Sequence, residues 1–463
     1  MRAAGFLLIA AVLQAQPVDR TKPPATLPVA PYKTPPIAEQ TLANGLRVVV
    51  VRDGRFPLVT LRLAFHAGSK FDPKDLSGLA EMTAFLLKEG TAKRSAKQIA
   101  EQAAAMGGAI EAAAGPDSLT VSASALSEHL EELLDLVADV AQNPVFPEQE
   151  LKLRKQNRAQ ELLAQRAEPA TVAEEKLHQL VFGTHPYARM LPAAESIERI
   201  SRDHLRQFHS RFLIPNNAVL LLVGDVPGPD SLGKLVQSKF GAWAKGAAPP
   251  AVEGRFPPPR RAGVLVDRPG SVQADIRVGK LSVDRHSPDY FPLLVGNAIL
   301  GGGASSRLFT ILREQKGYAY DVHSRQSPRR TGGLFEAVTQ VRNEAAGEAL
   351  LDLLAELRRF SSERVSAEEL TSVKNYLAGT FVIRLETQAG LADQLVMMKL
   401  MGLPDNYLET YVTRVRSVEP DQILKVAQKY INPADAALVV VGDAAQLGKQ
   451  LEKAGKFVVE RAK

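Results

Sequence analysis

Residues 218–225 read Ala-Val-Leu-Leu-Leu-Val-Gly-Asp, and residues 436–443 read Ala-Ala-Leu-Val-Val-Val-Gly-Asp. Each apolar run is short and ends at a glycine, which is typical of a buried β-strand. The two runs lie 218 residues apart, and further upstream the pair 150–151 recurs as 369–370 at a shift of 219. A shift that is nearly constant across separate motifs predicts a duplicated domain.

The two halves have the same predicted order of strands and helices. Strands are expected at 47–51, 59–65 and 219–223 in the first half, and at 263–267, 274–278 and 438–441 in the second. A helix predicted at about 147–165 has its counterpart at about 366–385. Because strands and helices are mixed and do not alternate strictly, the pattern favours an α+β fold of two duplicated domains, each a mostly antiparallel sheet covered by helices.

Proline-rich stretches divide the chain of 463 residues. Such stretches are extended and pack little on their own. The predicted organisation is a signal peptide at 1–15, a proline-rich extended segment at 16–37, an N-terminal domain at 38–244, a linker at 245–261 and a C-terminal domain at 262–463.

The beginning of the sequence predicts export. Arg2 precedes an apolar run at 3–13, and a small residue, Ala15, follows, which is the pattern of a secretory signal peptide. The chain has no cysteine and no later run long and apolar enough to span a bilayer. The net charge of +6 is spread among interspersed acids and bases, so we expect no nucleic-acid partner. These features predict a periplasmic or secreted protein without an integral membrane segment.

A series of motifs, weak when taken singly, follows in a specific order. They are 67–69 (Ala-Gly-Ser), 78–80 (Gly-Leu-Ala), 90–91 (Gly-Thr), 143–146 (Asn-Pro-Val-Phe), 185–187 (His-Pro-Tyr), 267–270 (Asp-Arg-Pro-Gly), 301–309 (Gly-Gly-Gly-Ala-Ser-Ser-Arg-Leu-Phe) and 312–320 (Leu-Arg-Glu-Gln-Lys-Gly-Tyr-Ala-Tyr). In this order and spacing the chain resembles the pitrilysin/insulinase peptidases, or inverzincins, and in particular the two-domain mitochondrial-processing-peptidase-like branch. The resemblance covers about 38–460 and implies two domains that form half of a clamshell.

Active members of that family carry an H-x-x-E-H motif, in which two histidines one helical turn apart hold zinc and the glutamate acts as general base. At the five corresponding positions this chain has Glu81, Met82, Thr83, Ala84 and Phe85. The resemblance implies a third ligand at Glu161, which is retained. None of the eight histidines are paired at a spacing of three or four residues. We therefore expect a degenerate zinc motif, made of Glu81, Ala84, Phe85 and Glu161, and no metal or other cofactor bound by this chain.

The second half retains Arg313 and Tyr320, which match the family's Arg/Tyr pair. In relatives this pair contacts the substrate carbonyl and the tetrahedral intermediate across a closed chamber, where fixed donors stabilise developing negative charge. Peptides in the family bind by adding a strand to a sheet edge, and the expected edge here is 109–114.

The leading hypothesis is a non-catalytic subunit of a heterodimeric zinc metalloendopeptidase. It would close the proteolytic chamber with a homologous partner that carries H-x-x-E-H and the zinc, and it would donate Arg313 and Tyr320 to a peptide substrate. No zinc-dependent peptidase activity is expected of the chain alone. The alternative is a proteolytically inactive scaffold or peptide-binding protein of the same fold. A third hypothesis is an active peptidase with unorthodox ligands, which zinc analysis would test.

Overall fold

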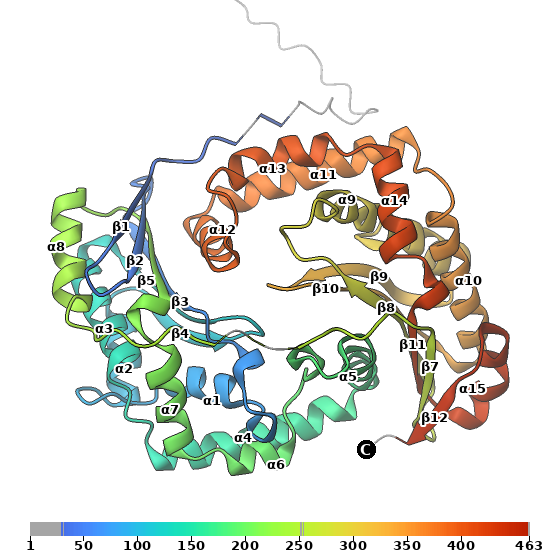
Figure 1. Ribbon diagram of the computed structural model, residues 1–463, viewed down its shortest axis with the longest axis horizontal. Helices are drawn as coiled ribbons and strands as arrows, with labels where there is room; N and C mark the ends of the chain where they lie inside the picture. Colours follow the sequence, from blue (N-terminus) through green and yellow to red (C-terminus); the bar gives the residue numbers. More distant parts are fainter. Residues whose placement is uncertain (1–28, 31, 251, 253, 462–463) are drawn as a thin grey trace, which may run out of the picture. The chain divides into compact units, whose positions relative to one another are not determined.

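The computed structural model describes residues 29–461 with the exception of 31, 251 and 253. The predicted signal peptide at 1–15 and the beginning of the proline-rich segment lie outside the described residues. Within the described part of the chain, two six-stranded sheets are each accompanied by helices (Figure 1). Across the same residues, no helix combines the length and the apolar character that crossing a membrane requires.

The first sheet has the strand order β1-β2-β6-β3-β5-β4. Its strands are β1 (Ile37–Thr41), β2 (Arg47–Arg52), β3 (Leu58–Phe65), β4 (Ala109–Ala114), β5 (Leu119–Leu126) and β6 (Ala218–Gly224). Only β2 and β6 run parallel, and the other neighbours are antiparallel. Every residue of β6 is buried, because this strand lies inside the sheet with both faces covered.

The second sheet has the order β12-β7-β11-β8-β10-β9. Its strands are β7 (Ala262–Asp267), β8 (Gln273–Ser282), β9 (Ala319–Pro328), β10 (Gly333–Arg342), β11 (Ala437–Gly442) and β12 (Val458–Arg461). The run β7-β11-β8-β10-β9 repeats the run β2-β6-β3-β5-β4, which confirms the predicted duplication and the mixed, largely antiparallel α+β class. The sixth strand of each sheet differs in origin. In the first sheet it is β1, from the beginning of the described chain, and in the second it is β12, from the end.

Some of the helices lie directly on the sheets, and others pack on neighbouring helices. The helices are α1 (Leu79–Leu86), α2 (Ala96–Ala105), α3 (Leu130–Gln142), α4 (Glu148–Ala167), α5 (Pro169–Phe182), α6 (Ala194–Arg199), α7 (Arg202–Phe212), α8 (Pro229–Phe240), α9 (Tyr290–Gly301), α10 (Ala346–Phe360), α11 (Ala367–Leu385), α12 (Gln388–Met401), α13 (Tyr407–Arg416), α14 (Pro420–Tyr430) and α15 (Ala444–Leu451). Helices α4 and α11 are among those that pack on neighbouring helices. In α3, Leu130, Leu133, Leu134 and Val137 recur at helical spacing and are buried.

Two helices pack against the sheet of the opposite half (Figure 1). Helix α5 precedes β6 in the chain but lies on β8 and β11 of the second sheet, and its Leu177 belongs to the same apolar core as Val439. Helix α12 lies on β3 and β6 of the first sheet. The segment 245–261 therefore lies between the strands of the two sheets in the sequence. In space, however, α5 and α12 each pack on the sheet of the other half.

Candidate functional site

The loop before α1 fixes where the degenerate zinc motif begins. Gly78 caps the helix with a φ of 96°, a left-handed conformation that favours glycine. The buried Asp72 carboxylate accepts hydrogen bonds from the backbone N–H groups of Gly78 (2.8 Å) and Ala80 (2.9 Å). Burial raises the pKa of Asp72 to about 7, while these two donors act in the opposite direction. The helix frame that carries H-x-x-E-H in active relatives is therefore built here.

Glu81 and Phe85 lie one helical turn apart on α1 and face two arginines of α4. The Glu81 carboxylate is 2.9 Å from Nε of Arg158 and 3.2 Å from Nη2 of Arg154. The Arg154 guanidinium carbon also lies 4.4 Å from the centre of the Phe85 ring, a cation–π contact. Arginine thus contacts both positions that histidine would occupy in an intact motif.

Glu161 joins the same cluster from the next turns of α4. Its carboxylate accepts a hydrogen bond from Arg154 Nη1 at 2.7 Å and lies 3.3 Å from Arg158 Nη1. Burial alone would raise the pKa of Glu161, but the hydrogen bond and the positive charges of both arginines hold this pKa below its usual range. The structure brings Glu81, Phe85 and Glu161 together through Arg154 and Arg158, two residues that the sequence did not single out.

These residues do not fit a zinc ion. Ala84 and Phe85 offer no ligand atom, and each of the two carboxylates is already paired with guanidinium groups. A divalent cation placed between Glu81 and Glu161 would meet the positive charges of Arg154 and Arg158. Among the residues that the structure describes, no group of three or more His, Asp or Glu side chains is arranged to hold a metal.

The spacing of Arg154 and Arg158 is the feature of the sequence that points to this cluster. They stand seven and three residues before Glu161 on one helix, which places all three on one face. Recognising them from the sequence would have required knowing that this face of α4 packs toward α1.

A cavity of about 170 Å³ borders the cluster. Glu81 and Asp72 line it, together with Ala114 at the end of β4, Arg189 and Arg329. Burial lowers the pKa of both arginines, and the buried Nε of Arg329 makes no hydrogen bond within the described residues. The cavity therefore combines carboxylates with incompletely satisfied guanidinium donors beside a strand end, an arrangement suited to peptide groups.

β4 is the edge of the first sheet and pairs only with β5 within the described chain. It occupies 109–114, the segment that the sequence analysis identified as the sheet edge. Glu111 forms an exposed ion pair of 2.6 Å with Lys88. The outer side of β4 therefore carries backbone groups free of strand partners in the described residues, as strand addition requires.

Arg313 and Tyr320 lie together in the second half. Arg313 belongs to a π-helical segment, Phe309–Gln315, and Tyr320 is the second residue of β9. The Arg313 guanidinium carbon lies 4.5 Å from the centre of the Tyr320 ring and 4.7 Å from that of Phe309. Tyr320 is 83% exposed, Arg313 is half-buried, and Arg313 has no carboxylate partner in the described part of the chain. No contact among these residues joins the pair to the Glu81 cluster.

Known proteins share both the sequence pattern and the fold. Residues 47–195 match the family model described as insulinase, peptidase family M16, and residues 199–377 match the one described as the peptidase M16 inactive domain. An uncharacterized zinc protease of Bacillus subtilis (strain 168), YmxG, is 25% identical over 410 residues, which cover 88% of this chain and 98% of that protein.

Two solved structures superpose on most of the chain. A crystal structure described as the peptidase M16 inactive domain of Pseudomonas fluorescens has a TM-score of 0.82 and 29% identity, and covers 88% of this chain and 98% of its own. A protease from Helicobacter pylori has a TM-score of 0.81 and 20% identity, and covers 88% of this chain and all of its own, a likeness of fold.

The fold and the site define a two-domain, metallopeptidase-like protein in which guanidinium groups contact the positions of the zinc-binding histidines. The chain belongs to the pitrilysin/insulinase family, peptidase family M16, and it is a member that lacks the H-x-x-E-H motif.

Proposed function

We propose that this chain is the non-catalytic subunit of a heterodimeric zinc metalloendopeptidase in the periplasm or outside the cell. Its partner is a homologous chain that carries H-x-x-E-H and binds the zinc. The observation that carries the proposal is the contrast between the two halves. Arg154 and Arg158 pair with the carboxylates of the degenerate motif, whereas Tyr320 is exposed, Arg313 is half-buried, and neither side chain has a carboxylate partner in the described residues.

The chemistry assigned to Arg313 and Tyr320 is the stabilisation of negative charge. The Tyr320 and Phe309 rings hold the Arg313 guanidinium by cation–π contacts, so its charge is oriented before a substrate arrives. In the proposed dimer the guanidinium and the Tyr320 hydroxyl donate hydrogen bonds to the oxygen that becomes negative when a peptide carbonyl is attacked.

The test uses the purified chain mixed with an H-x-x-E-H homologue from the same organism. The chain alone is expected to contain far less than one zinc and to cleave no peptide, and the mixture is expected to cleave. Arg313→Ala and Tyr320→Phe should each lower kcat roughly 100-fold, the loss typical of removing one oxyanion donor.

Matched controls are available for this test. Arg342→Ala removes an exposed arginine at the end of β10, and Tyr376→Phe alters a tyrosine that is 58% exposed on α11. Both should leave kcat unchanged. Full activity of the Arg313→Ala and Tyr320→Phe mixtures would refute the role of the pair, and stoichiometric zinc in the isolated chain would refute the non-catalytic assignment.

A peptide-binding scaffold without a proteolytic partner is the second candidate. The unpaired edge of β4 and the adjoining cavity at Ala114 favour it. Purification of the chain from its native host distinguishes the two, because recovery of an H-x-x-E-H chain in constant ratio supports the heterodimer. Recovery of the chain without such a partner, but with affinity for extended peptides, supports the scaffold.

A further inference from the structure

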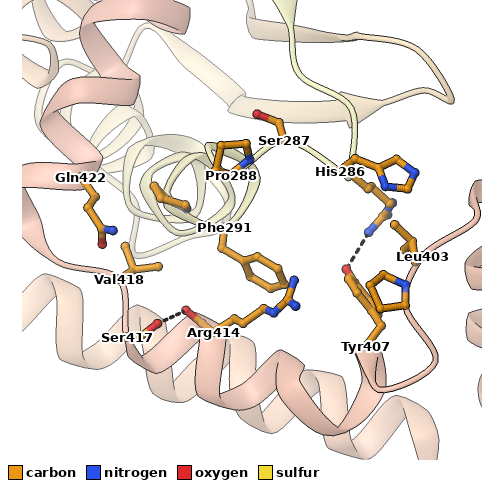
Figure 2. Close-up of a pocket in the computed structure, with 13 residues that line it drawn as sticks. His286, Ser287, Pro288, Phe291, Leu403, Tyr407, Arg414, Ser417, Val418 and Gln422 are labelled. Atoms are coloured by element: carbon orange, nitrogen blue, oxygen red, sulfur yellow. Dashed lines mark hydrogen bonds between the residues drawn. The ribbon is translucent and has the colours of Figure 1, made fainter.

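A cavity of about 290 Å³ lies in the second half, remote in sequence from the degenerate motif. The loop before α9, the start of α9, the α12–α13 loop, α13 and the beginning of α14 enclose it (Figure 2). Its volume is at the lower limit for small-molecule sites, which suits a compact ligand.

The cavity is lined by positively charged side chains and by no carboxylates. Arg285 and Arg414 line it, and none of the thirteen lining residues is Asp or Glu. Neither arginine lies within ion-pairing distance of a carboxylate in the part of the chain that the structure describes. Arg277, a buried arginine of the same half, is by contrast paired with Glu336 at 2.9 Å. Uncompensated guanidinium groups in a cavity attract an anion.

Arg285 is held in place by neutral groups. Its Nη1 donates to the hydroxyl oxygens of Tyr290 (2.6 Å) and Tyr407 (3.4 Å), and its guanidinium carbon lies 5.1 Å from the centre of the Tyr290 ring. Burial raises the pKa of Tyr290, so that hydroxyl stays protonated and leaves the positive charge unbalanced. Nε and Nη2 of Arg285 make no hydrogen bond within the described residues, and they are the donors that a bidentate carboxylate needs.

Part of the remaining wall is apolar, and His286, Ser287, Ser417 and Gln422 supply the polar part. Figure 2 shows Phe291 beside the Arg414 side chain, whose guanidinium carbon is 5.6 Å from the ring centre. Leu403, Tyr407 and Val418 supply further buried apolar surface. A fully hydrated inorganic ion would leave this surface without a partner, whereas an apolar group on the ligand would cover it.

We propose that this cavity binds a small organic carboxylate with an apolar or aromatic body. The acidic group pairs with Arg285 and Arg414, and the body lies against Phe291 and Leu403. This proposal is independent of the subunit role, because it uses neither the degenerate zinc motif nor the Arg313–Tyr320 pair.

Calorimetric titration of the full chain at neutral pH tests the proposal with four probes. They are 3-phenylpropionate, its neutral amide 3-phenylpropionamide, acetate and inorganic phosphate. The phenyl acid is expected to bind at least about tenfold more tightly than the amide, which lacks the charge, and than acetate, which lacks the ring.

Substitutions of the lining arginines test whether the ligand binds in this cavity. Arg414 is exposed, so Arg414→Gln leaves the fold intact and should weaken binding of 3-phenylpropionate about tenfold. Arg416→Gln, on the same helix but outside the cavity, is the matched control and should bind as the unaltered chain does. Arg285→Lys keeps the charge but loses the planar fork, and it should also weaken binding.

Three results would overturn the proposal. They are equal binding of acid and amide, unchanged affinity in Arg414→Gln, and no binding of any probe at about 10 mM. Tighter binding of phosphate than of 3-phenylpropionate would assign the cavity to an inorganic anion and would reject the organic ligand.

Discussion

Arg158 on α4 places its guanidinium against Glu81, at the position where an H-x-x-E-H motif carries its first histidine. Arg158 is only 5% exposed, so its charge requires the carboxylates of Glu81 and Glu161 as partners. Arg154 adds a second guanidinium that covers Phe85. At the scale of single residues, the metal position has been replaced by an ion-pair cluster that keeps α1 and α4 together.

This cluster predicts that restoring ligands is not enough to restore zinc binding. A Glu81→His and Phe85→His chain regains two imidazoles beside Glu161, but Arg154 and Arg158 still oppose a cation. We expect far less than one zinc per chain after dialysis. Adding Arg154→Gln and Arg158→Gln should raise the zinc affinity by about tenfold or more. The measurement is metal content together with a competitive zinc titration.

The control for this series is the chain that carries only Arg154→Gln and Arg158→Gln, which should bind no zinc because the imidazoles are missing. Stoichiometric zinc in the chain with the two histidines and both arginines would show that the positive charges do not govern the site.

At the scale of elements, the most consequential feature is the crossing of α5 and α12 between the halves. Arg277 on β8 donates to the carbonyl oxygen of Ala170 in α5 at 3.0 Å. On the other side, Gln388 of α12 donates to the carbonyl oxygen of Asp53 at 3.1 Å, and Asp393 pairs with Arg62 at 2.9 Å. Each sheet therefore depends on a helix from the other half for part of its cover.

Gly279 on β8 tests this packing, because a Cβ built there would stand 2.8 Å from Cδ2 of Leu177 on α5. Gly279→Ala should lower the free energy of unfolding by about 1–3 kcal/mol through overpacking. Leu177→Ala should lower it by about 2–5 kcal/mol through a cavity. In the double variant the new methyl group occupies part of that cavity, so the combined loss should fall short of the sum by about 1 kcal/mol or more.

Urea unfolding of the four chains measures this coupling. Gly379→Ala is the matched control, because a Cβ at that position in α11 meets no atom within 4 Å. It should leave the chain unchanged or slightly more stable, since alanine favours a helix over glycine. Strictly additive losses at Gly279 and Leu177 would contradict the contact between α5 and the second sheet.

At the scale of the whole molecule, a polar network connects the two halves through Arg330, which lies between β9 and β10. Arg330 Nη1 contacts Nδ1 of His66 at 2.8 Å and donates to the carbonyl oxygen of Leu400 at 2.6 Å. Its backbone N–H donates to the Asp117 carboxylate at 3.0 Å, and Asp117 also pairs with Lys70. The network ties the first sheet to the turn between two strands of the second.

His66 makes this network sensitive to acid. Burial, and then the charges of Arg330 and Lys70, lower the pKa of His66 to about 4. In the unfolded chain the same imidazole takes up a proton near pH 6.5. The contribution of neutral His66 to the free energy of unfolding is therefore complete above pH 6.5. It is lost as the pH falls from there to about 4, by at most about 1.4 kcal/mol per pH unit.

Thermal unfolding midpoints at pH 7 and pH 4.5 check this dependence. His66→Gln removes the titrating group, so its midpoint should fall less between the two pH values than that of the unaltered chain. An equal fall in both proteins would mean that carboxylates elsewhere account for the acid sensitivity.

The local pattern predicted much of the fold. The apolar runs at 218–225 and 436–443 became β6 and β11, and the helices expected near 147–165 and 366–385 became α4 and α11. Such elements follow from hydrophobic periodicity and end signals, which act over a few residues. The loss of the zinc motif could be recognised for the same reason. The motif consists of two histidines at a fixed spacing on one helix, so their absence at positions 81 and 85 is a local property of the sequence.

The sequence by itself determined the duplicated α+β architecture, the loss of the zinc ligands and the retention of Arg313 and Tyr320. Only the tertiary structure decided that Arg154 and Arg158 contact Glu81 and Phe85, that α5 and α12 cover the opposite sheets, and that Arg330 reaches His66. The physical reason is that an amphipathic face or a charged side chain specifies the kind of partner it needs. Which distant residue supplies that partner depends on packing between elements that are far apart in the chain.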